Sequence, residues 1–263
     1  MYSSADYQTG SDYKDTFNVK ETSYEHDIEA QIREGTRIGF IRKVYGILSV
    51  QLAITFGISC LGMIESVQSI FMYKINEHNY LTSVGLGLLI TCCILFFFTL
   101  IPLACCRVVG RSVPINYILL LLFTLSQSYL VMLCCCCYPY HIVLTAMGLT
   151  AAVTISLTIY ALTTKEDFTW LGGLLFSTIT ILIIGGILCF VWGFSSGYGY
   201  HVLYCCCGIL VYSIYIIFDT QLIAGKYGTV FQIDDYIIAA LNIYIDIIQL
   251  FLFILSLLGG GKK

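Results

Sequence analysis

Two aspartates lie deep inside hydrophobic runs near the end of the chain. Asp219 lies in YSIYIIFDTQLI, within residues 202–223, and Asp246 lies in LNIYIDIIQLF, within residues 236–258. An ionised carboxylate in the middle of a bilayer is costly, so such an acid indicates a functional site with a nearby partner. Each aspartate is the obvious candidate partner of the other.

Helical spacing places polar side chains beside each aspartate, on one face of its helix. They are Tyr212 and Tyr215 on the face of Asp219, and Asn242 and Gln249 on the face of Asp246. Two carboxylates close together in a low-dielectric site do not both ionise easily, so one shared proton is favoured. Full deprotonation favours repulsion, hydration or entry of a divalent cation, whereas protonation favours a closed, hydrogen-bonded bridge. The pair therefore predicts a proton sensor that changes between a closed bridge and a hydrated or cation-bound state.

The composition indicates a membrane protein. Of the 263 residues, 58% are hydrophobic and 11% charged, and the mean hydropathy is +0.86. A soluble domain of this size would carry more charge on its surface. The 13 Lys and Arg residues form no basic stripe, which argues against nucleic-acid binding.

The apolar runs predict an all-α polytopic fold, because each is near the length of about 20 residues that crosses a bilayer as a helix. We place seven transmembrane helices at about 41–64, 81–104, 115–136, 139–162, 169–192, 202–223 and 236–258. Residues 1–35 hold eight of the 16 acids and lack apolar periodicity, so we expect a disordered acidic tail. Residues 36–263 are expected to form the seven-helix membrane domain.

The distribution of Lys and Arg predicts a cytosolic N-terminus, with eight basic residues on the inner side and three on the outer side. Lys262 and Lys263 oppose this assignment, because seven spans place them outside. The last segment could instead be re-entrant, which leaves the side of the C-terminus open.

The 13 cysteines include three consecutive blocks at or near predicted helix ends. The blocks are Cys105–Cys106, Cys134–Cys137 and Cys205–Cys207. Consecutive cysteines on a helix fan outward and do not converge as zinc ligands do. Two alternatives remain open, which are helix packing by small polarisable side chains and reversible palmitoylation near membrane ends.

Four stretches resemble the transmembrane Bax-inhibitor-motif family, and within it the lifeguard branch. They are FIRKVYGILSVQLAIT (40–55), FTLSQSY (123–129), YIIFDTQLIAG (215–225) and DDYIIAALNIYIDIIQLFLFILSLLG (234–259). The resemblance implies a fold in which the last helix is central and surrounded by the other six. It also implies an endoplasmic reticulum or Golgi location, suppression of apoptosis and a pH-sensitive calcium leak. The family's two intramembrane acids correspond to Asp219 and Asp246, and Arg107 is the nearest position to a family arginine that steadies the closed state.

Three classes of function fit these residues. The first is a calcium leak channel gated by Asp219 and Asp246, which also form a transient calcium site. Calcium is the transported ion and no cofactor is expected. Apoptosis-regulating membrane proteins are candidate partners. The second is a non-conducting scaffold that suppresses apoptosis through protein partners, with the aspartates only hydrogen-bonding neighbouring helices. The third is an intramembrane aspartyl protease. The third is disfavoured because Asp246 lies in YID, not in the GxGD setting of presenilin-type proteases, so we expect no enzyme.

Overall fold

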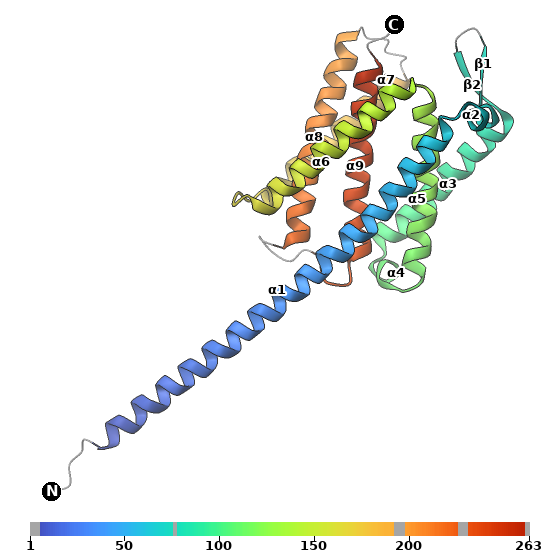
Figure 1. Ribbon diagram of the computed structural model, residues 1–263. Coiled ribbons are helices and arrows are strands. Elements are labelled where there is room, and N and C mark those ends of the chain that lie inside the picture. Colours follow the sequence, from blue (N-terminus) through green and yellow to red (C-terminus); the bar gives the residue numbers. More distant parts are fainter. Residues whose placement is uncertain (1–5, 76–77, 192–197, 226–230, 261–263) are drawn as a thin grey trace.

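The computed structural model describes residues 6–75, 78–191, 198–225 and 231–260. Most of this part of the chain is helical (Figure 1). In chain order the elements are α1 (Asp6–Gly62), α2 (Glu65–Phe71), β1 (Met72–Ile75), β2 (His78–Leu81), α3 (Ser83–Cys105), α4 (Arg107–Arg111), α5 (Ile115–Cys136), α6 (Tyr140–Thr163), the 3-10 helix η1 (Thr169–Leu171), α7 (Gly172–Val191), α8 (Tyr198–Ala224) and α9 (Tyr236–Gly259).

Seven segments of the described helices are long and apolar enough to cross a membrane, which confirms the predicted polytopic all-α fold. They are Glu34–Gly62, Ser83–Cys105, Ile115–Cys136, Tyr140–Thr163, Thr169–Ile187, Gly199–Ala224 and Tyr236–Gly259. Proline helps to set two of the boundaries. Pro114 and Pro139 directly precede α5 and α6, where the missing N–H of proline breaks no helical hydrogen bond.

Helix α9 is the most buried of the seven spans. In its most apolar stretch 67% of the residues are buried, against 11% for the spans of α3 and α7. It packs against α8 and α6 on one side and against α1 and α5 on the other (Figure 1). Ala239 and Ala240 are fully buried, and such small side chains let neighbouring helices approach closely. That all six other spans surround α9 stays a prediction.

Helix α1 differs from the sequence-based expectation at its start. The sequence predicted disorder for residues 1–35, whereas α1 is continuous from Asp6 and its N-terminal half extends away from the bundle (Figure 1). Residues 6–33 contain no proline and one glycine. Extending an existing helix by one residue avoids the cost of a new nucleus, so the span beginning at Glu34 can propagate into this segment. The cytosolic location of the segment stays a prediction.

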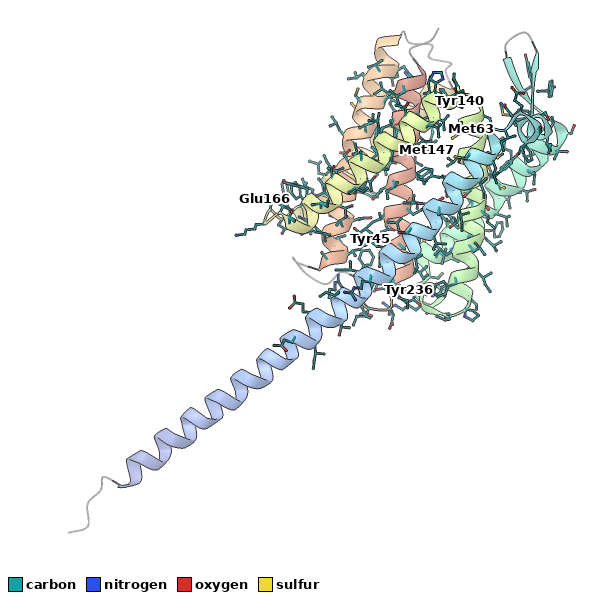
Figure 2. All side chains as sticks on the ribbon, in the orientation of Figure 1. Tyr45, Met63, Tyr140, Met147, Glu166 and Tyr236 are labelled. Carbon is teal, nitrogen blue, oxygen red and sulfur yellow. The ribbon has the colours of Figure 1, made fainter. Side chains whose placement is uncertain are left out.

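Two stretches between the predicted transmembrane helices, residues 65–80 and 107–114, were expected to be loops but contain helices or strands. Residues 65–75 and 78–81 form α2 and an antiparallel hairpin of β1 and β2, in which Tyr73 pairs with Tyr80 and their ring centroids lie 5.8 Å apart in a stacked arrangement. Thr82 then caps α3 by accepting a hydrogen bond from the backbone N–H of Gly85. In the second stretch, residues 107–111 form α4. We call the two ends of the bundle the hairpin end and the α4 end; Tyr140 lies toward the first and Tyr236 toward the second (Figure 2).

Candidate functional site

Asp219 on α8 and Asp246 on α9 face each other inside the bundle. Each residue is only 6% exposed, and the carboxyl groups lie within reach of a side-chain hydrogen bond. The Asp246 Oδ2 atom is buried and has no hydrogen-bond partner. In the described part of the chain, no Lys or Arg side chain acts on either carboxyl group. Each acid therefore has the other as its hydrogen-bond partner, and no described basic side chain balances their charge.

The two predicted tyrosines lie on the same side of α8 as the carboxyl pair. Tyr212 is buried, and its ring centroid lies 6.0 Å from that of Tyr215. The Tyr212 hydroxyl interacts electrostatically with Asp246, and the Tyr215 hydroxyl interacts with both aspartates. The polar face that helical spacing predicted for α8 thus extends from Tyr212 to Asp219.

The remaining predicted site residues are the amides Asn242 and Gln249 and the arginine Arg107. Asn242 and Gln249 are half-buried on α9, and neither side chain has a hydrogen bond to another residue in the described ranges. Arg107 begins α4 and is exposed, and its charge acts on Asp235. The structure therefore does not bring Arg107 to the aspartate pair.

The residues next to Asp219 connect α8 to other elements. The Thr220 hydroxyl lies 3.3 Å from the Tyr45 hydroxyl of α1. Gln221 is fully buried and holds the loop after α6, because its Nε2 donates to the Glu166 carbonyl at 2.8 Å and its Oε1 accepts from the Phe168 N–H at 2.9 Å. Glu166 marks this loop at the tip of α6 (Figure 2). The segment DTQ therefore fixes Asp219 relative to α1, α6 and α9.

A hydroxyl network that the sequence reading missed lies on the other side of α9. Thr55 Oγ1 is 2.8 Å from the Tyr244 hydroxyl and 2.9 Å from Ser128 Oγ. All three residues are fully buried, and they join α1, α5 and α9. Tyr244 precedes Asp246 by two residues, a rotation of about 200° around a helix of 3.6 residues per turn. A sequence signal existed, because Gln51, Thr55 and Ser59 follow i, i+4 spacing in an otherwise apolar span.

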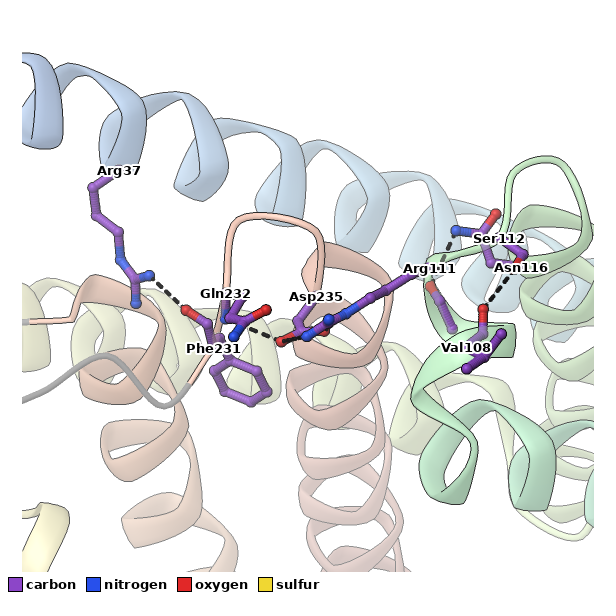
Figure 3. Close-up of polar contacts among 9 residues, drawn as sticks. Arg37, Val108, Arg111, Ser112, Asn116, Phe231, Gln232 and Asp235 are labelled. Carbon is purple, nitrogen blue, oxygen red and sulfur yellow. Dashed lines mark hydrogen bonds and ion pairs between the residues drawn. The ribbon is translucent and has the colours of Figure 1, made fainter.

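An ion pair ties α4 to the start of α9. Arg111 donates from Nε to Asp235 Oδ1 at 2.7 Å and from its NH2 group to Asp235 Oδ2 at 2.9 Å (Figure 3). Asp235 Oδ2 also accepts from the Gln232 N–H. The Arg111 guanidinium holds the pKa of the Asp235 carboxyl below its usual range, mainly through these hydrogen bonds. The residue immediately before α9 is thus held charged and bound to α4.

Arg37 of α1 makes a second connection at the same end. Its guanidinium donates to the Leu222 carbonyl at 2.8 Å. It also donates to the Phe231 carbonyl at 3.0 Å (Figure 3). Gly225 ends α8 with a φ of 67°, and a Cβ there would lie 2.7 Å from Arg37 Nε. Glycine provides both the left-handed conformation and the space for this contact. We call Arg37, Arg111 and Asp235 the boundary clamp.

The donor atoms at the aspartate pair suit a transient cation better than a resident metal. Across the ranges that the structure describes, no group of three or more His, Cys, Asp and Glu side chains is arranged to hold a metal ion. Calcium usually takes six to eight oxygen ligands, whereas the pair supplies two carboxyl groups. The calcium site and the gating role of Asp219 and Asp246 stay predictions.

Comparison with known proteins places most of the chain in one family. Residues 37–263 match the family model described as inhibitor of apoptosis-promoting Bax1. The chain is 37% identical over 221 residues to Protein lifeguard 3 of Homo sapiens, which covers 84% of this chain and 68% of that protein. It is 33% identical over 253 residues to Protein lifeguard 3 of Mus musculus, with coverage of 90% and 78%. It is 36% identical over 230 residues to BI1-like protein of Arabidopsis thaliana, with coverage of 86% and 82%.

Proposed function

Because the chain belongs to the Bax inhibitor family of multi-pass membrane proteins, whose description is that of apoptosis inhibitors, we propose that it is a pH-sensitive calcium leak of internal membranes. The leak is gated by Asp219 and Asp246, and apoptosis is modulated through the calcium that it releases. The endoplasmic reticulum or the Golgi is the membrane that fits this role.

The observation that carries the proposal is a pair of buried carboxyl groups within hydrogen-bonding reach of each other in the interior of a lipid-spanning bundle. Such a contact is strongest when one proton is shared, because a hydrogen bond to a charged acceptor is stronger than a neutral one. Loss of the shared proton leaves two negative charges in a low-dielectric site, which favours separation of α8 from α9 and entry of water or a divalent cation. The protonation state of the pair then sets the opening.

The orientation of the protein in the membrane follows from the charges at the two ends of the bundle. Basic side chains gather at the α4 end and in the loop after α6; they are Arg37, Arg42, Lys43, Arg107, Arg111 and Lys165. An excess of Lys and Arg marks the cytosolic side of a membrane protein, so the α4 end faces the cytosol in this proposal. Lys226, Lys262 and Lys263 lie outside the described residues.

Calcium flux from reconstituted liposomes tests the gate. We expect the wild-type leak to change with pH, because loss of the shared proton leaves two negative charges at the pair. Asp219→Asn and Asp246→Asn should each flatten this profile, because an amide cannot take up or release the shared proton. Asp234→Asn is a matched control, since Asp234 is an exposed acid before α9. A wild-type flux and pH profile in both pair variants would exclude the gate.

A second candidate function is a scaffold for apoptosis-regulating proteins, and the extension of α1 from Asp6 beyond the bundle supports it. Deletion of residues 1–33 removes this extension and leaves the span that begins at Glu34. If the deletion abolishes protection of cells from apoptosis while the liposome leak is unchanged, the protective activity belongs to the extension. If protection persists and follows the leak in the Asp219 and Asp246 variants, the scaffold role is excluded.

A further inference from the structure

Cys105 and Cys106 occupy the junction between α3 and α4. Cys105 is the last residue of α3, and Cys106 lies between the two helices with φ −104° and ψ 90°. Both residues are exposed, as are Ala104 and Arg107 on either side of them. These two thiols thus project outward at the membrane boundary.

The other two cysteine blocks contain side chains that are buried between helices. Cys135, Cys136 and Cys205 are buried. The Cys136 Sγ donates to the Gly62 carbonyl at 3.2 Å, and the Cys205 Sγ lies 3.7 Å from His201 Nε2. Helix packing explains these buried thiols but does not explain Cys105 and Cys106.

The surroundings of the exposed pair fit a fatty acyl chain. Phe98, Ile101 and Cys105 follow i, i+3 and i+7 spacing and so share one face of α3. Phe98 is 73% exposed and Ile101 is 56% exposed. An acyl chain on Cys105 could lie along this apolar face within the hydrocarbon layer, while the basic residues of α4 remain at the polar surface.

We propose that Cys105 and Cys106 are S-acylated by a long-chain acyl-CoA thioester. This inference rests on the orientation proposed above, in which the α4 end faces the cytosol, where acyl-CoA is found. It does not depend on calcium conduction. Juxtamembrane cysteines at such positions are typical S-palmitoylation sites.

The chemistry is a thioester exchange without oxidation or reduction. A deprotonated thiol of Cys105 or Cys106 attacks the carbonyl carbon of the donor thioester. A new bond forms between Sγ and this carbon, the bond between carbon and the sulfur of coenzyme A breaks, and the released thiolate takes up the proton. The product is a thioester that neutral hydroxylamine cleaves.

The modification would act on the element that carries the boundary clamp. Arg107 directly follows Cys106, and Arg111 at the end of α4 binds Asp235 before α9. An acyl chain at the junction therefore fixes the depth of α4 in the membrane, and through the ion pair it fixes the start of α9.

Metabolic labelling of cells that express the full chain tests the proposal. Cells receive an alkynyl palmitate analogue, and the purified protein is assayed for label that hydroxylamine removes. We expect label on the wild-type chain, its loss in Cys105→Ser/Cys106→Ser, and its retention in Cys134→Ser/Cys137→Ser. The second variant is a matched control, because Cys134 and Cys137 are also exposed but lie at the opposite end of the bundle.

Peptide mapping of the labelled wild-type protein keeps the test independent of how the variants fold. It should locate the acyl group on the peptide that contains Cys105 and Cys106. Absence of label on the wild-type chain, or its persistence in Cys105→Ser/Cys106→Ser, would overturn the proposal. Label on Cys134 and Cys137 alone would overturn both the proposal and the orientation, and none of these outcomes bears on the calcium flux.

Discussion

The two sides of α9 hold polar groups of different chemistry. On the side of α1 and α5, Tyr244 joins Thr55 and Ser128 through neutral hydroxyl hydrogen bonds. On the side of α8, Asp246 faces Asp219, and the buried Asp246 Oδ2 has no partner. A neutral network keeps the same hydrogen bonds across the physiological pH range, whereas a carboxyl pair changes its interaction with each proton that it gains or loses. The same helix can thus be fixed on one side and released on the other.

The largest effect is expected on the hydroxyl side. Tyr244→Ala should lower the free energy of unfolding by about 3–5 kcal/mol, because it leaves a cavity at a fully buried aromatic position. Tyr244→Phe should cost about 1 kcal/mol, because it removes the hydroxyl and leaves Thr55 and Ser128 bonded to each other. Unfolding by SDS in mixed micelles measures both values. A Tyr244→Phe variant as stable as wild type would show that the Tyr244 hydroxyl contributes no net stability.

A smaller effect of a different kind is expected on the carboxyl side. Asp246→Asn should leave the free energy of unfolding within about 1 kcal/mol of wild type at neutral pH, because the amide has the same shape and keeps a hydrogen bond to Asp219. The same unfolding assay, repeated across pH, should show less pH dependence in this variant than in the Asp234→Asn control. A loss as large as that of Tyr244→Ala would mean that Asp246 serves helix adhesion, and the contrast between the two sides would fail.

The boundary clamp should contribute least. Arg111→Gln and Asp235→Asn should each lower the free energy of unfolding only slightly, since the partly exposed Arg111 side chain is screened by solvent. The double variant should cost no more than either single variant, because all three changes remove the same ion pair. Additive losses in this double-mutant cycle would show that the two side chains act independently.

The pH dependence of the clamp has a definite sign. The pKa of Asp235 is lower in the folded protein than in the unfolded chain, so its stabilisation is fully present above the unfolded value of about 4 and is lost as pH falls through the folded pKa. Asp235→Asn should therefore leave any pH response near neutrality unchanged. If that response disappears in this variant, the clamp and not the aspartate pair is the sensor.

The sequence predicted the parts of the molecule that depend on hydrophobic periodicity. Seven spans were placed at nearly the observed boundaries, and helical spacing placed Tyr212, Tyr215 and Asp219 on one face. The hydroxyl network was missed because Thr, Ser and Tyr are common in membrane helices, and only the packing of α1, α5 and α9 shows that Thr55, Ser128 and Tyr244 meet.

Long-range pairing explains one further difference between the sequence-based predictions and the structure. The family resemblance suggested Arg107 as a partner of the aspartate pair, whereas neither arginine of α4 reaches the pair, and Arg111, four residues after Arg107, binds Asp235. Charge and approximate position are visible in a sequence, but the choice between two arginines depends on how α4 sits against the start of α9. The continuation of α1 into residues 6–33 was missed for a local reason, since the acidic and polar composition of that stretch resembles a solvated coil.

Infrared spectroscopy of the carboxyl groups tests the central claim most directly. If Asp219 and Asp246 share a proton, the wild-type protein shows the C=O stretching band of a buried protonated carboxyl group, and the band titrates with pH. The band should be absent from Asp219→Asn/Asp246→Asn and unchanged in Asp234→Asn. A wild-type protein without such a band at any pH, or a band that persists in the double variant, would contradict the account.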